Sequence, residues 1–122
     1  MRMEAVTKTI LLVDDDEVSR VATRRYLATF GYAVDAVHGA KEALALFNPQ
    51  THDLVLTDNS MPGMSGAELA HVLKLRSPLT PVVMYSSNPP KNPAGLDLVL
   101  RKPADLSKLR DSFARLLPGC SV

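Results

Sequence analysis

Apolar runs alternate with longer amphipathic stretches along the whole chain, and this alternation limits the possible folds more than any other feature. Residues 10–13 read ILLV and residues 54–57 read LVLT, with almost no polar side chain among them. Such continuous apolar runs are typical of strands that helices cover on both faces of a sheet. Strands that alternate with helices predict an α/β domain with a parallel sheet, in which we expect residues 10–13 to form the central strand.

The pattern predicts where each strand and helix lies. Strands are expected at residues 10–13, 33–37, 54–57, 81–85 and 98–100, and helices at about 16–30, 40–47, 65–76 and 106–117. Asp15 or Asp16 is expected to cap the first helix and Gly31 to end it. Ser65 and Glu68 have the spacing of a capping box, in which each side chain accepts a hydrogen bond from the other residue's backbone N–H.

The connection between the fourth and fifth strands breaks the alternation. Residues 86–97 read SSNPPKNPAGLD, and three of these residues are prolines. Proline lacks a backbone N–H donor and its ring obstructs the preceding turn, so a regular helix does not fit there. We expect an extended or irregular crossover.

The composition excludes several classes of protein. The 122 residues suffice for one domain, and we expect no second one. With 14 basic and 13 acidic side chains, the formal net charge of +1 argues against a surface that binds nucleic acid by charge. The single cysteine, Cys120, excludes an internal disulfide. No signal peptide or membrane-spanning apolar run is present. We therefore expect a cytoplasmic protein that binds neither nucleic acid nor membrane.

Polar residues follow four of the five predicted strands, at the edge where ligands bind in open parallel sheets. These residues are Asp14, Asp15, Asp16, Asp58, Ser86, Ser87 and Lys102, and we expect three or four of the carboxylates, a hydroxyl and the lysine to meet there. Carboxylates that lie close together repel unless a cation or a proton offsets their charge. Because the set holds oxygen ligands without histidine or thiol, it predicts a Mg²⁺ site. A bound cation, a lysine and a hydroxyl are suited to phosphoryl transfer.

These motifs are similar to those of response-regulator receiver domains of two-component signalling, over about residues 8–118. The resemblance rests on four stretches: 10–16 (ILLVDDD), 53–58 with 61–66 (DLVLTD and MPGMSG), 81–86 (PVVMYS) and 101–103 (RKP). It implies a flavodoxin-like, doubly wound five-stranded parallel sheet in the order 2-1-3-4-5. It also implies that residues 1–122 hold a single receiver domain, either acting alone or cut from a larger protein.

The resemblance implies a role for each site residue. Asp58 corresponds to the phosphoacceptor, which takes a phosphoryl group from a phosphohistidine. Asp15 corresponds to the direct Mg²⁺ ligand, Asp14 to its partner acting largely through water, and Asp58 together with the backbone carbonyl of Ser60 completes the protein's ligands. The residue at position 60 also tunes the hydrolysis of the acyl phosphate in this family.

Two further side chains would contact the transferred group. Ser86 corresponds to the hydroxyl that turns toward the phosphoryl group, and Lys102 to the lysine that bridges to it, usually ahead of a cis proline, here Pro103. The implied partner is a sensor histidine kinase or a histidine phosphotransfer domain, docked on the first helix near Arg20, Arg24 and Arg25. The downstream partner and the oligomeric state stay open.

The chain departs from the family pattern in its output region. Val99 stands where the family has a signalling aromatic, and the segment Pro89–Pro93 stands where it has a helix used for dimerisation and output. We hypothesise that activation reorders residues 86–95 instead of rotating an aromatic ring.

Three readings of function follow. The leading one is a receiver whose phosphorylation switches partner binding, and not an enzyme acting on a separate substrate. A pseudo-receiver that binds without phosphorylation is an alternative. So is a haloacid-dehalogenase-like phosphohydrolase, because residues 14–18 also fit an Asp-x-Asp-x-Val motif in which Asp14 would be the nucleophile and Asp16 the acid/base. His38, His52 and His71 show no ligand spacing, and we expect them to be surface or boundary residues.

Overall fold

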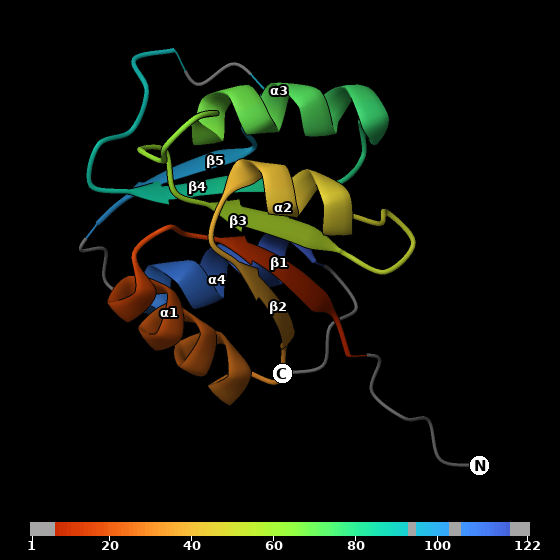
Figure 1. Ribbon diagram of the computed structural model, residues 1–122. Helices are drawn as coiled ribbons and strands as arrows, with labels where there is room; N and C mark the ends of the chain where they lie inside the picture. Colours follow the sequence, from red (N-terminus) through yellow and green to blue (C-terminus); the bar gives the residue numbers. More distant parts are fainter. Residues whose placement is uncertain (1–6, 93–94, 103–105, 118–122) are drawn as a thin grey trace.

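Five parallel strands form the sheet of the computed structural model, which describes residues 7–92, 95–102 and 106–117 (Figure 1). Along this part of the chain the elements are β1 (Thr9–Val13), α1 (Glu17–Thr29), β2 (Ala33–Val37), α2 (Ala40–Leu46), β3 (Leu54–Thr57), α3 (Gly66–Arg76), β4 (Val82–Ser86), β5 (Leu98–Arg101) and α4 (Leu106–Leu116). Each expected element is present, with bounds that differ by one residue at most.

The strand order β2-β1-β3-β4-β5 confirms the doubly wound, flavodoxin-like topology. The expectation that residues 10–13 form the central strand is wrong, because β3 occupies the middle of the sheet and β1 lies one position away. Both strands are buried along almost their whole length. A continuous apolar run reports burial on both faces, which every interior strand shares, and therefore does not fix the position in the sheet.

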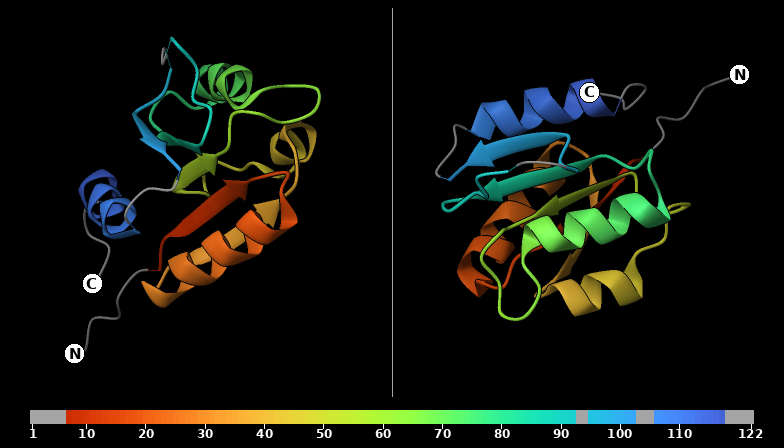
Figure 2. Two further views of the ribbon diagram at one scale, coloured as in Figure 1. Left: turned by 90° about the vertical axis from the view of Figure 1, so that its left-hand side faces the viewer. Right: turned by 90° about the horizontal axis from the view of Figure 1, so that it is seen from above.

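Helices cover both faces of the sheet in pairs, as Figure 2 shows in its left view, where α1 and α4 lie on one side and α2 and α3 on the other. Leu27 of α1 packs with Leu109 and Phe113 of α4 against the first face. Ala43 of α2 and Leu69 of α3 pack against the second. The sheet is thus fixed between two apolar layers, and its polar strand ends project from the core.

The helix ends agree with the sequence. Asp16, and not Asp15, caps α1, because its carboxylate accepts a hydrogen bond from the backbone N–H of Ser19 at 2.9 Å. Gly31 follows the helix with φ of 90°, a conformation that glycine adopts without a steric penalty. The capping box between Ser65 and Glu68 is present at the start of α3. Its hydrogen bonds hold the pKa of the exposed Glu68 carboxyl below its ordinary value, chiefly through the Ser65 backbone N–H.

The crossover from β4 to β5 contains no helix among its described residues, as expected from its prolines, and it runs beside α3 (Figure 2). Asp97 fixes its far end: the Asp97 carboxylate accepts a hydrogen bond from the Val82 backbone N–H at 2.7 Å and lies 2.7 Å from the Lys74 ammonium. Pro103 and Cys120 lie outside the described residues, as does the predicted cis bond. No helix within the described ranges has the length and apolar character needed to cross a membrane.

His52 corrects one expectation. Its side chain is only 2% exposed, its Nε2 lies 2.8 Å from an Asp35 carboxylate oxygen, and its Nδ1 accepts a hydrogen bond from the Asn48 backbone N–H. His52 is therefore a buried residue whose two ring nitrogens both have partners, whereas His38 and His71 are exposed as expected.

Candidate functional site

The register of the sheet brings the first two aspartates to one edge. Val13 at the end of β1 is paired with Thr57 at the end of β3, so Asp14 and Asp58 leave neighbouring strands at the same level. The backbone N–H of Asp58 continues this ladder by donating to the Val13 carbonyl at 2.9 Å. The positions of both carboxylates thus follow from strand pairing.

Asp14, Asp15 and Asp58 form an acidic cluster in which one oxygen from each carboxylate lies within 4.8 Å of the others. Asp14 is buried, Asp58 is half-buried and Asp15 is exposed. Asp16 is not part of the cluster, because its carboxylate caps α1. Three close carboxylates repel one another, and their hard oxygen ligands are the kind that Mg²⁺ prefers. The donor set therefore fits a divalent cation.

Lys102 supplies the positive charge at this edge. Its ammonium lies 3.0 Å from an Asp14 carboxylate oxygen and 3.5 Å from one of Asp58, and it donates to the Ser19 hydroxyl at 2.9 Å. Burial of the ammonium lowers the pKa of Lys102, but the hydrogen bond and charge of Asp14, with the charge of Asp58, outweigh burial and raise the pKa above its ordinary value. The Tyr85 ring adds a cation–π contact, with its centroid 5.3 Å from the ammonium.

Ser86 ends β4 beside this cluster and is 1% exposed. Its hydroxyl oxygen accepts a hydrogen bond from the Asn88 backbone N–H at 3.0 Å. The backbone N–H of Lys102 donates to the Ser86 carbonyl at 2.9 Å, so the two residues lie on adjacent strand ends. Ser60 is exposed, two residues after Asp58, and its hydroxyl accepts a hydrogen bond from the Asn88 amide at 3.2 Å.

Asn59 has no counterpart among the residues predicted from the sequence, yet it makes four hydrogen bonds next to Asp58. Its backbone N–H donates to Asp58 Oδ1 at 2.7 Å, and its carbonyl accepts from the Gly66 N–H at 2.9 Å. Its side-chain oxygen accepts from the Ala67 N–H at 3.2 Å, and its side-chain nitrogen donates to the Asn88 carbonyl at 2.9 Å. Asn59 thus connects Asp58, the first turn of α3 and the crossover.

Val99 stands opposite Met84 in the β4–β5 pairing and is partly buried. The departure noted in the sequence therefore concerns a strand position beside the middle of β4. Tyr85 is the aromatic side chain that contacts Lys102 in the described part of the chain. The contact comes from β4 and not from β5, where Val99 stands.

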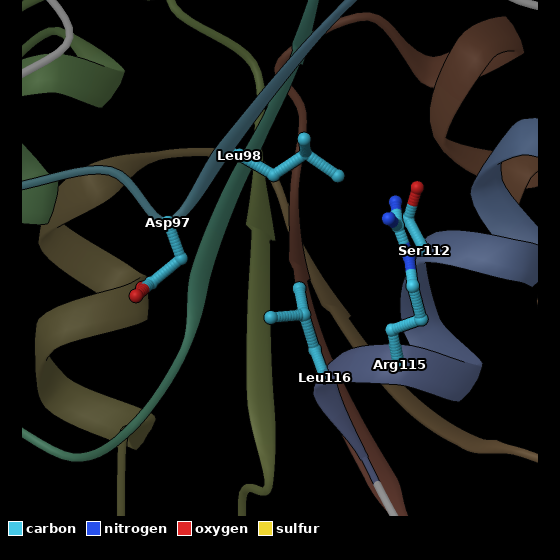
Figure 3. A pocket seen from close by; sticks show the side chains of 5 residues that line it. All are labelled: Asp97, Leu98, Ser112, Arg115 and Leu116. Atoms are coloured by element: carbon cyan, nitrogen blue, oxygen red, sulfur yellow. The ribbon is translucent and has the colours of Figure 1, made fainter.

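A cavity of about 250 Å³ lies elsewhere, between β5 and α4 (Figure 3). Leu98 of β5 and Leu116 of α4 extend into it, next to Ser112 and Arg115, whereas Asp97 points away. None of the predicted site residues lines this cavity, and it does not adjoin the acidic cluster. Its lining offers mainly apolar surface and no group of carboxylates.

Comparisons with known proteins agree with this geometry. The family model for the response regulator receiver domain matches residues 10–114. The aerobic respiration control sensor protein ArcB of Escherichia coli is 36% identical in an alignment 108 residues long that covers 82% of this chain and 14% of ArcB. The sensor protein EvgS of the same bacterium is 32% identical in an alignment 113 residues long that covers 88% of this chain and 9% of EvgS. The chain thus spans only a small part of the curated relatives that it matches.

Solved structures share the fold. The response regulator TrrA of Thermotoga maritima, in complex with Mg²⁺-BeF, is 27% identical with a TM-score of 0.85, covering 91% of this chain and all of the other. A receiver domain from Methanospirillum hungatei is 28% identical with a TM-score of 0.84, covering 90% and 93% of the two chains. TrrA bound to the histidine kinase ThkA is similar too, at 27% identity and a TM-score of 0.83, covering 91% of this chain and 99% of the other.

Proposed function

The chain belongs to the response-regulator receiver domain family of two-component signalling, and on that premise we propose that it accepts a phosphoryl group from a phosphohistidine on Asp58. The contact that carries the proposal is the Lys102 ammonium, which faces Asp58 and Asp14 at 3.5 and 3.0 Å. A phosphoryl group on Asp58 would lie within reach of this cation, which offsets charge on the transferred oxygens.

The acidic cluster is proposed to hold Mg²⁺ through Asp14, Asp15, Asp58 and the backbone carbonyl of Ser60. One ammonium facing three carboxylates leaves a formal charge of about −2, which a divalent cation offsets. When bound, the cation would supply charge neutralisation at the phosphoryl oxygens.

The protein's own groups would carry the rest of the transfer. An oxygen of the Asp58 carboxylate attacks phosphorus, the bond from phosphorus to the donor imidazole breaks, and its electron pair returns to that ring. Lys102 and the Ser86 hydroxyl donate hydrogen bonds to the phosphoryl oxygens as charge develops. Hydrolysis later returns Asp58 to a carboxylate, with Ser60 at the position through which water would approach.

The partner surface is proposed to be the exposed side of α1. Val18 is 78% exposed and Val21 is 40% exposed, and Arg24 and Arg25 lie exposed beside them. Arg20 differs, because its guanidinium donates to the Asp14 carbonyl at 2.9 Å and so helps to fix the site. An apolar pair flanked by cations suits a helical surface of a sensor kinase or a histidine phosphotransfer domain.

We propose that residues 8–118 are one receiver domain whose output is a change in partner binding, not turnover of a separate substrate. The switch would reorder residues 86–95, because the described crossover has no helix and Val99 offers no ring. The downstream partner would contact this reordered segment.

Intact mass spectrometry tests the proposal. With acetyl phosphate and Mg²⁺, the wild type should gain one phosphoryl adduct that is absent from Asp58→Asn and hydrolyses with time. Asp53→Asn, a change in a carboxylate that bonds the Thr9 backbone at the other end of the sheet, serves as the control and should keep the adduct. No adduct on the wild type would favour a pseudo-receiver. An adduct that survives Asp58→Asn but disappears in Asp14→Asn would favour the phosphohydrolase. The structure does not favour that alternative, because the Asp16 carboxylate, its acid/base, caps α1.

A further inference from the structure

The crossover is held to the phosphoacceptor loop through Asn88. The Asn88 backbone carbonyl accepts a hydrogen bond from the Asn59 side chain at 2.9 Å, and the Asn88 side-chain amide donates to the Ser60 hydroxyl at 3.2 Å. The Asn88 backbone N–H donates to the Ser86 hydroxyl oxygen. Each of these partners lies within two residues of Asp58 or at the end of β4.

The orientation of the Asn59 side chain is fixed by its neighbours. Its Oδ1 faces the Ala67 backbone N–H, which only donates, and its Nδ2 faces the Asn88 carbonyl, which only accepts. The reversed amide would set donor against donor and acceptor against acceptor. Asn59 therefore joins α3 to the crossover in one defined arrangement.

Phosphorylation of Asp58 would change Asn59, whose side chain holds the Asn88 carbonyl, and Ser86, whose hydroxyl accepts from the Asn88 N–H. The Asp58 Oδ1 that accepts the Asn59 N–H belongs to the carboxylate that becomes an acyl phosphate, which changes the charge and position of that acceptor. When the Ser86 hydroxyl turns toward the new phosphoryl group, it no longer accepts the hydrogen bond from the Asn88 backbone N–H. The Asn88 N–H then loses its acceptor, and the backbone N–H of Asn59, whose side chain holds the Asn88 carbonyl, faces a changed acceptor.

We infer that Asn59 is a positioning residue that ties residues 87–92 to the phosphoacceptor loop, so that the state of Asp58 sets the freedom of this segment. The inference rests on the proposed function and adds the residue through which the site would control the crossover. The coupling runs through hydrogen bonds between neighbouring loops. It does not require a signalling aromatic, whose position in this chain is occupied by Val99.

Amide exchange measured by NMR tests the coupling at residues 87, 88, 91 and 92, since residues 89 and 90 are prolines. In the wild type, Mg²⁺ with beryllofluoride should speed this exchange by about fivefold, the change expected for losing one net hydrogen bond. Asn59→Ala without any phosphoryl analogue should already exchange that fast. Asn59→Asp keeps an oxygen for the Ala67 N–H but loses the donor to Asn88, and should behave alike.

Ser65→Ala is the matched control, because it weakens the start of α3 and leaves the Asn59–Asn88 hydrogen bond in place. It should exchange like the wild type at residues 87–92. Unmodified Asn59 variants that exchange as slowly as the wild type would overturn the inference while the Asp58 adduct still forms. A wild type that forms no adduct would remove the proposed function and this inference with it.

Discussion

Gly66, the first residue of α3, lies so close to Asp58 that a β-carbon on it would overlap the Asp58 carbonyl oxygen. The Gly66 N–H also donates to the Asn59 carbonyl at 2.9 Å. The start of α3 therefore rests directly on the backbone of the proposed phosphoacceptor. The obstructing atoms belong to the backbone, so neither segment yields by a rotamer change.

Gly66→Ala is expected to destabilise the protein by about 1–3 kcal/mol, the usual effect of forcing extra volume into a packed site. It should also slow phosphorylation, because Asp58 or α3 must shift. Urea unfolding and the rate of adduct formation measure the two effects. In Gly39→Ala the new β-carbon meets only the flexible Glu42 carboxylate at 3.5 Å, so phosphorylation should stay normal. A Gly66→Ala protein with wild-type rate and stability would contradict the steric argument.

Lys102→Met tests how the charge of the Lys102 ammonium affects Mg²⁺ binding and phosphorylation. Removing the ammonium leaves three carboxylates without their cation, so Mg²⁺ should bind more tightly, as isothermal titration calorimetry would report. Phosphorylation should become slower by on the order of a hundredfold, since a donor to the transferred group is lost. Lys108→Met, a change at an exposed lysine of α4, should alter neither quantity. Weaker Mg²⁺ binding in Lys102→Met would show that the lysine organises the acidic cluster instead of competing with the cation.

The strand ends can be predicted from the sequence because the local apolar pattern marks where each strand begins and ends. Apolar runs locate the strands, and the polar residues that follow them lie at the ligand edge, so the pattern predicts the places of Asp14, Asp58 and Lys102. The prediction that β1 is the central strand is wrong, because apolar runs do not report the order of the strands.

Residues that act through long-range contacts left no local signal. Ser19 contacts Lys102 across 83 residues of sequence, and Asn59 contacts Asn88 across 29. Nothing in the local sequence distinguishes Ser19 or Asn59 from other polar residues, because their partners are distant in the chain. The burial of His52 has no local signal either, since its partner Asp35 lies in β2, 17 residues away.

Glu68 predicts a dependence of stability on acid. Because hydrogen bonds from Ser65 lower its folded pKa beneath the ordinary value of 4.5, its contribution is fully present above pH 4.5 and is lost as the pH falls through the folded pKa. Glu68→Gln should therefore be less stable than the wild type at neutral pH, and the difference should shrink in acid. Urea unfolding at several pH values measures the difference. A gap that stays constant with pH would contradict the assignment of the shift to Glu68.

Asp97→Ala should release the far end of the crossover. The Asp97 carboxylate accepts from the Val82 backbone N–H and pairs with Lys74, which also donates to the Thr80 carbonyl at 2.9 Å. Because the carboxylate is about one-third exposed, solvent screens the ion pair, and we expect the loss of about 1–2 kcal/mol from the backbone hydrogen bond and the pair together. Urea unfolding measures this value.

The matched change is Asp111→Ala, which removes a carboxylate that is 70% exposed and 3.7 Å from Arg110. It should leave stability within about 0.5 kcal/mol of the wild type. Asp97→Asn keeps an oxygen for the Val82 N–H and loses the charge beside Lys74. Its stability should therefore lie between that of Asp97→Ala and that of the wild type. If Asp97→Asn were as unstable as Asp97→Ala, the ion pair with Lys74 would be the main restraint on the crossover, and the hydrogen bond to β4 a minor one.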